Sequence, residues 1–136
     1  KLFGNNNKFE FDYDISNLKS MEKAELIITD NSTIVFEYYL IFKRPLIYLE
    51  YSDKVHNSFY ENIKILPIEE IFKKRFGKTV TIKSLNDLGK ICREEIENKK
   101  IDVKDLNDFI NDYLSNFDHS AKFAAETLVK KIGKNK

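Results

Sequence analysis

The sequence predicts an α/β fold with a parallel sheet and helices on both of its faces. Short apolar runs rich in β-branched residues alternate with helical patterns in the first part of the chain, and such alternation is typical of β-α-β units. The last part carries apolar residues at helical spacing only, which predicts a helical C-terminus. Because the length of 136 residues suits one domain, we expect residues 1–136 to form a single α/β domain.

Two apolar runs supply the expected buried strands. Glu25–Thr29 is short and β-branched, and we interpret it as a central strand that is buried on both faces. Leu46–Tyr51 reads as the next buried strand. Phe9–Tyr13 alternates apolar and polar residues, a pattern that predicts a half-exposed strand near the N-terminus.

The segment between these runs, Thr33–Phe42, is ambiguous. Its β-branched and aromatic residues have a higher propensity for strand than for helix. Ser32, however, is a good N-cap directly after a strand. A helix between two parallel strands would be buried on most of its surface, so it need not be amphipathic. These residues leave strand and helix open, and we interpret the segment as a helix chiefly because of the resemblance described below.

The remaining elements follow from capping residues and from helical spacing. Asp14 or Ser16 would cap a short helix that ends near Lys23, and Thr79–Ile82 would form a brief strand or extended link. The other expected helices are Ile68–Phe76 after Pro67, a helix opened by Ser84 that carries Cys92 inward, Val103–Phe117, and Ala121–Ile132, which Gly133 stops.

Composition excludes several classes of function. The 23 basic and 22 acidic residues nearly cancel, so we expect no nucleic-acid binding driven by phosphate neutralisation. A single cysteine, Cys92, excludes an internal disulfide. His56 and His119 lack the spacing of metal ligands, and we expect no metal site. No apolar run is long enough for a transmembrane segment.

Polar residues gather where the two expected strands end. In an open parallel sheet, ligands bind outside the carboxyl ends of the strands. The cluster Thr29–Thr33 follows one strand and the loop Ser52–Tyr60 follows the next, so both should border one crevice. The loop contributes three candidate ligand contacts, Asp53, His56 and Tyr60.

The start of the expected helix suits a phosphate. Its first amide N–H groups lack intrahelical partners and lie at the positive end of the helix dipole, where the hydroxyls of Ser32 and Thr33 would assist. Glu37 lies one turn further, about 6 Å along the axis, where its carboxylate would accept hydrogen bonds from a ribose. In the alternative reading, Ser32 only caps the helix and Glu37 pairs with Lys43 or Arg44.

The segment Leu18–Pro45 resembles the donor-binding half of the CDP-glycerol glycerophosphotransferase family, whose members polymerise teichoic-acid-type chains. The resemblance rests on Ala24-Glu-Leu-Ile-Ile-Thr-Asp-Asn-Ser-Thr-Ile-Val-Phe-Glu37 and the following Lys43-Arg-Pro-Leu-Ile-Tyr48. Weaker likeness extends through Phe76–Thr79, Leu85–Leu88 and Asp118–Ala125. The chain departs from the family pattern where Asn31 replaces tyrosine, Thr33 replaces serine and Glu37 replaces aspartate.

This resemblance implies a Rossmann-like sheet that is part of a GT-B C-terminal domain, and a chain that begins partway into that domain. It implies that the cluster Asp30, Asn31, Ser32 and Thr33 binds the phosphates of a nucleotide-activated donor, CDP-glycerol or a nucleotide sugar, and that Glu37 binds its ribose. Asp30 would chiefly hold the loop through backbone N–H groups. No cofactor is implied.

The implied reaction transfers glycerol phosphate or a sugar to a polymer acceptor of the cell surface. An N-terminal GT-B domain that is missing here would complete the enzyme, so we expect the isolated chain to be inactive. The implied location is cytoplasmic or peripheral at the inner face of the cell membrane. Two alternatives stay open, a non-catalytic α/β interaction module and, ranked below it, a domain resembling the UDP-sugar 2-epimerases.

Overall fold

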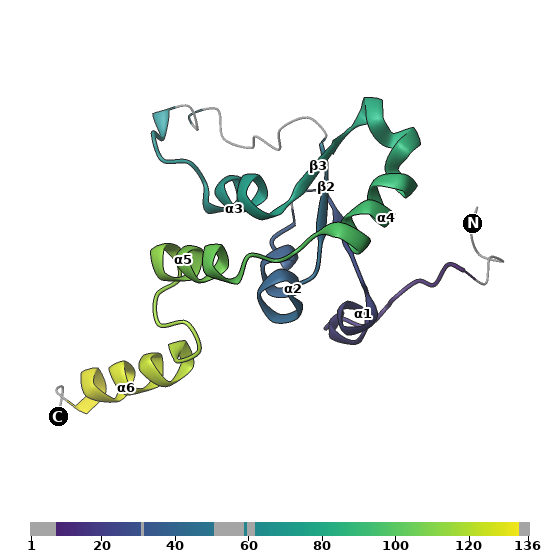
Figure 1. The fold of residues 1–136 in the computed structure, drawn as a ribbon. Coiled ribbons are helices and arrows are strands. Elements are labelled where there is room, and N and C mark those ends of the chain that lie inside the picture. Colours follow the sequence, from purple (N-terminus) through teal and green to yellow (C-terminus); the bar gives the residue numbers. More distant parts are fainter. Residues whose placement is uncertain (1–7, 31, 51–58, 60–61, 134–136) are drawn as a thin grey trace. The chain divides into compact units, whose positions relative to one another are not determined.

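Three parallel strands organise the first part of the chain: β1 (Ile27–Thr29), β2 (Leu46–Glu50) and β3 (Lys78–Thr81). They form one sheet in the order β1-β2-β3 (Figure 1). Ile27 is paired with Leu46, and Ile47 is paired with Lys78. The structure is a computed structural model that describes residues 8–30, 32–50, 59 and 62–133.

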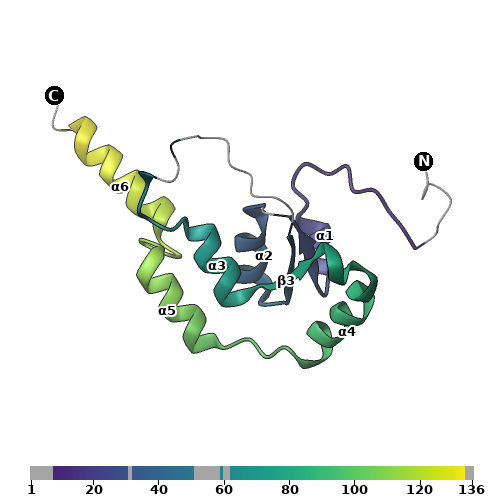
Figure 2. The same ribbon diagram turned by 90° about the horizontal axis from the view of Figure 1, so that it is seen from above.

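Helices connect these strands and lie on both sides of the sheet, which confirms the expected α/β class. α2 (Ile34–Phe42) leads from β1 to β2, α3 (Ile68–Phe76) precedes β3, and α4 (Leu88–Asn98) follows it. α2 and α3 lie on one side of the sheet and α4 lies on the other (Figure 2). This arrangement follows from right-handed crossovers between neighbouring parallel strands.

α2 confirms the helical interpretation of a segment whose residues favour strands. Its side chains Val35, Tyr38 and Tyr39 are almost fully buried. The ring centroids of Tyr39 and Phe72 lie 5.6 Å apart at nearly right angles, and those of Phe36 and Phe72 lie 4.4 Å apart. Burial of these aromatic rings outweighs the propensity difference, which is only a few tenths of a kcal/mol per residue.

The end of α2 is tied to the end of α1 (Leu18–Lys23) by hydrogen bonds to main-chain carbonyls. The Tyr38 hydroxyl donates to the carbonyl oxygen of Ala24 at 2.8 Å. The Arg44 guanidinium donates to the same oxygen at 2.6 Å and to that of Glu22 at 2.7 Å. These bonds satisfy carbonyls that a helix leaves without partners at its C-terminus.

The expectation that Glu25–Thr29 forms a central strand buried on both faces is wrong. β1 lies at the edge of the described sheet, and Ile28 is 42% exposed. β2 is the central strand, and Leu46, Ile47 and Tyr48 are all buried. An apolar β-branched run has the same composition in either place, because the position of a strand depends on neighbours that are distant in the sequence.

Phe9–Tyr13 does not form the expected strand either. The residues belong to no strand, and the side chains of Phe9, Phe11 and Tyr13 are exposed. The rings of Phe9 and Phe11 contact each other edge to face at 4.8 Å. Alternation of apolar and polar residues is not sufficient for a strand, because the segment must also pair with a sheet edge, which these residues do not do.

The chain divides into two compact units, Lys1–Lys99 and Lys100–Lys136, and the expectation of a single domain stays a prediction. The second unit contains α5 (Val103–Tyr113) and α6 (Ser120–Gly133), which confirms the helical C-terminus. α5 begins with a side-chain cap, because Asp102 Oδ1 accepts a hydrogen bond from the Asp105 N–H at 3.0 Å. None of the helices in the described ranges is long and apolar enough to cross a membrane.

Gly77 is required where α3 turns into β3. A Cβ atom at this position would lie 2.3 Å from Cε2 of Tyr48, whose ring is buried. We expect Gly77→Ala to lower the free energy of unfolding by about 1–3 kcal/mol, measured by urea denaturation. Gly89→Ala is the matched control, because nothing lies near its Cβ position and helical alanine is more stable than glycine by up to about 1 kcal/mol. Equal effects at the two positions would contradict the close approach of Tyr48.

Tyr48 should make the protein sensitive to alkali. Burial, assisted by the nearby Glu70 carboxylate, raises the pKa of Tyr48 far above its usual value, which is about 10. Above about pH 10 the unfolded chain therefore binds fewer protons than the folded chain, and stability falls as the pH rises.

The comparison of wild type with Tyr48→Phe isolates this effect. We expect the variant to lose less stability above about pH 10, by up to about 1.4 kcal/mol per pH unit. Urea denaturation at several pH values measures this, and the contributions of Tyr38 and Lys99 cancel because both proteins contain them. Parallel stability curves would show that the Tyr48 hydroxyl ionises equally well in both states.

Candidate functional site

The carboxyl ends of all three strands meet at one edge of the sheet, which we call the carboxyl edge. β1 ends at Thr29, β2 at Glu50 and β3 at Thr81, and Glu50 is paired directly with Thr81. Asp30, Ser32 and Thr33 follow β1 at this edge, as the sequence predicts. The other predicted contacts, Asn31, Asp53, His56 and Tyr60, lie outside the described residues.

The N-cap residue of α2 makes no side-chain capping hydrogen bond. We expected Ser32 to be the N-cap, but Thr33 occupies that position. This difference from the expected N-cap has a local cause, because Thr33 already adopts helical backbone angles (φ −69°, ψ −16°). The Ser32 hydroxyl oxygen lies 3.5 Å from the Ile34 nitrogen, beyond the usual range for such a bond. Ser32 and Thr33 are both exposed.

Glu37 lies in the first turn of the same helix, and its side chain is exposed. Within the described part of the chain, its carboxylate takes part in no ion pair. The alternative partners lie elsewhere, since Arg44 is bound to main-chain carbonyls and Lys43 forms the C-cap at the far end of α2. The structure therefore does not form the salt bridge that would explain Glu37 as a purely structural residue.

A third group of polar residues, which was not predicted from the sequence, lies at the carboxyl edge directly after β3. The hydroxyl oxygens of Thr81 and Ser84 lie 3.4 Å apart directly after β3, and the Lys83 side chain between them is exposed. We expected Ser84 to open the following helix, but the chain first forms the 3₁₀ turn η2 (Ile82–Asp87), and Asp87 is the N-cap of α4. The sequence carries a pattern that could have predicted this group. Thr81 ends a β-branched run, as Thr29 does, so polar residues after it were candidates for the same edge of the sheet.

One hollow of the described structure lies away from the carboxyl edge. It has a volume of about 310 Å³ and is lined by Gly77, Lys78, Glu94, Glu95, Asn98 and Lys99. Gly77 and Lys78 lie where β3 begins, so the hollow is at the opposite, amino edge of the sheet. Of the predicted site residues that the structure describes, Asp30, Ser32, Thr33 and Glu37, none lines it.

Candidate metal ligands do not gather anywhere in the described ranges, at either edge of the sheet. Comparisons of the chain with protein-family models, curated proteins and solved structures found no match. The resemblance of Leu18–Pro45 to the glycerophosphotransferase family therefore rests on the residues of that segment alone.

The hydroxyl of Ser32 should contribute little to stability, because its bond to the Ile34 N–H is long. We expect Ser32→Ala to change the free energy of unfolding by less than about 0.5 kcal/mol. Asp102→Ala removes a well-formed N-cap from α5 and should cost about 1 kcal/mol. Urea denaturation followed by circular dichroism measures both. If Ser32→Ala lowers the free energy of unfolding as much as Asp102→Ala does, the Ser32 hydroxyl caps α2 and the expectation is wrong.

Proposed function

We propose that the carboxyl edge beside α2 binds a nucleotide-activated donor, and that the chain is the donor-binding part of a transferase. The single observation that carries this proposal is the start of α2. This helix begins directly after β1, has an N-cap residue that makes no side-chain capping hydrogen bond, and is flanked by the exposed hydroxyls of Ser32 and Thr33.

The chemistry of this helix start suits phosphate oxygens. Unpaired amide N–H groups and the helix dipole attract negative charge, and the two hydroxyls add hydrogen-bond donors. Negative charge develops on the nucleotide phosphates when a transferred group leaves. Ser32, Thr33 and the α2 amides would stabilise that charge without forming a covalent bond.

The carboxylate of Glu37 suits the nucleoside part of the same donor. It lies one helical turn from Thr33, about 6 Å along the axis, and it is exposed and without an ion pair among the described residues. A carboxylate oxygen accepts a hydrogen bond from each of two vicinal hydroxyls. A pyrophosphate at the start of α2 would place a ribose within reach of it.

The open edge of the sheet supports a Rossmann-like fold that continues beyond β1. The described sheet leaves the outer edge of β1 unpaired, and Ile28 is 42% exposed there. In doubly wound sheets, ligands bind where the strand order reverses. Strands added beside β1 would create this reversal next to Asp30, Ser32 and Thr33.

In this proposal the rest of the enzyme supplies the catalytic base and the acceptor site. Such an enzyme transfers glycerol phosphate or a sugar to a cell-surface polymer and works in the cytoplasm or at the inner face of the membrane. The support for these finer assignments is the resemblance of Ala24–Glu37 and of Lys43–Tyr48 to the glycerophosphotransferase family.

Titration of the chain with CDP-glycerol, CDP-ribitol and UDP-sugars tests the proposal. We expect one of these donors to shift the backbone amide NMR signals of residues 32–36. Ser32→Ala combined with Glu37→Gln should weaken binding at least tenfold, because charge-assisted hydrogen bonds are lost. Glu97→Gln is the control, since it removes an exposed carboxylate near the opposite edge of the sheet.

Two results would overturn the donor site. One is the absence of amide shifts with every donor at millimolar concentration. The other is binding that is equally weakened by Glu97→Gln and by the double variant. Either result would favour the interpretation of the chain as a non-catalytic interaction module, in which α2 serves only as core.

A further inference from the structure

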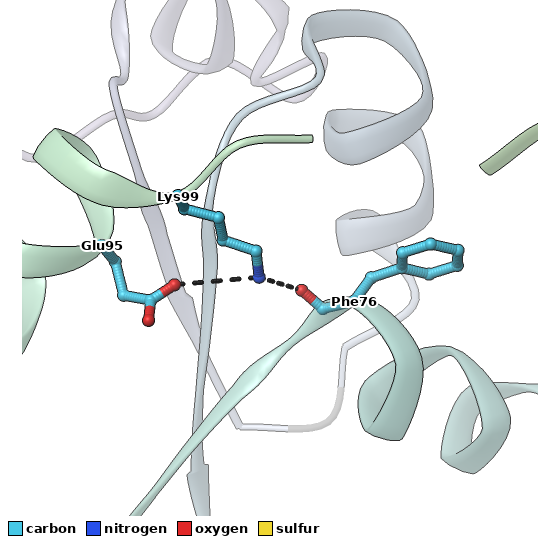
Figure 3. A network of polar contacts seen from close by, with 3 residues as sticks. All are labelled: Phe76, Glu95 and Lys99. Carbon is cyan, nitrogen blue, oxygen red and sulfur yellow. Dashed lines mark hydrogen bonds and ion pairs between the residues drawn. The ribbon is translucent and has the colours of Figure 1, made fainter. Parts of the chain in front are cut away.

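The hollow at the amino edge of the sheet is built around one lysine. Lys99 is the C-cap of α4, and its ammonium donates a hydrogen bond to the carbonyl oxygen of Phe76, the last residue of α3. Its Nζ atom also lies 3.7 Å from a carboxylate oxygen of Glu95. Figure 3 shows Nζ between these two oxygens. An ammonium has three N–H donors, so these two contacts leave one donor for a ligand.

Lys99 differs from an ordinary surface lysine in exposure and in charge environment. Its side chain is 23% exposed, whereas that of Lys90 on the same helix is 71% exposed. Burial, with a smaller contribution from the positive charge of Lys78, lowers the pKa of Lys99, while the Glu95 carboxylate opposes this change. Desolvation and a neighbouring cation are the two means by which proteins make a lysine amine nucleophilic.

The other residues of the hollow supply groups that recognise a small anion. Lys78 and Asn98, whose side chains end in an ammonium and an amide, line the same space as Lys99. Glu94 also lines it, but its carboxylate lies 3.8 Å from the ammonium of Lys90, which offsets its charge. A volume of about 310 Å³ is at the lower end of the range for small-molecule sites.

We propose that this hollow binds a small oxo acid whose carbonyl carbon condenses reversibly with the amine of Lys99. The carboxylate of the ligand would contact Lys78 and Asn98, and its carbonyl group would face Nζ. This site lies at the opposite edge of the sheet from the proposed donor site, and it depends on none of the same residues.

The condensation balances without an oxidant or a reductant. The unprotonated amine of Lys99 attacks the carbonyl carbon, so a C–N bond forms and the carbonyl oxygen becomes a hydroxyl. That hydroxyl then takes a proton and leaves as water, which yields a protonated imine. Glu95 lies next to the nitrogen, where a carboxylate passes the one proton that the amine loses to the carbonyl oxygen. The second proton that the departing oxygen takes comes from solvent. Addition of water reverses every step.

Reductive trapping tests the proposal on the intact chain. The protein is incubated with pyruvate or glyoxylate at pH 7.5 and treated with borohydride, and the modified lysines are mapped by peptide mass spectrometry. We expect Lys99 to be modified at least tenfold more than Lys90, with saturation as the oxo acid concentration rises. Propanal, which lacks the carboxylate, should show a smaller preference for Lys99 and no saturation.

Two variants separate a ligand site from a merely reactive amine. Lys99→Arg should abolish the saturable modification while circular dichroism stays unchanged. Lys78→Met should reduce modification of Lys99 severalfold at pH 7.5, because it removes the partner of the ligand carboxylate and also raises the pKa of Lys99. The charged groups that face Lys99 in the hollow are Lys78, Glu94 and Glu95. Of these, Lys78 lowers the pKa of Lys99, so Lys78→Met should shift the pH profile to higher pH.

The wild-type result alone can overturn the proposal. Modification of all lysines in proportion to their exposure would do so, as would preferential modification of Lys99 that propanal reproduces fully. These outcomes leave the donor site untouched, because nucleotide binding is measured at the other edge of the sheet.

Discussion

The packing of α2 against α3 is the interaction on which the described α/β unit depends. Residues of α2 favour strands in isolation, so the helix exists because Tyr39 and Phe36 bury their rings against Phe72. Phe72 is itself fully buried, and the ring centroids of Phe76 and Tyr39 lie 5.1 Å apart. Each buried aromatic side chain contributes about 1.5–3 kcal/mol, which exceeds the summed propensity cost at these positions. Loss of this contact would remove both the crossover helix and the reason for β1 and β2 to lie parallel.

The same packing makes the two edges of the sheet different. At the amino edge, the ends of the helices are tied to main-chain carbonyls by Tyr38, Arg44 and Lys99. At the carboxyl edge, the N-cap residue of α2 makes no side-chain capping hydrogen bond, and Ser32, Thr33 and Glu37 are exposed. Scaffolds of this kind hold helices at one edge and leave backbone donors and polar side chains for ligands at the other.

Local chemistry predicted most of what depends on neighbours in the sequence. The helices α2, α3, α5 and α6 lie where the sequence predicts helices, and Asp30, Ser32 and Thr33 lie at the carboxyl edge as expected. The position of β1 at an edge could not be predicted, because it depends on which strands pair. Neither could the contact of Lys99 with Phe76, which joins residues 23 positions apart. The N-cap is Thr33 and not the expected Ser32, because the backbone angles of a single residue determine where a helix begins.

Stability alone does not readily explain why a partly buried ammonium, that of Lys99, occupies position 99. A partly buried ammonium loses hydration, and replacement of buried ion pairs by apolar side chains of similar volume is often neutral or stabilising. The pKa of Lys99 is lowered, which shows that its contacts with Glu95 and Phe76 do not fully offset this loss. The desolvation is therefore a cost to the fold that a methionine would avoid. A chemical role for an amine that lies beside a carboxylate and lines a hollow would account for that cost.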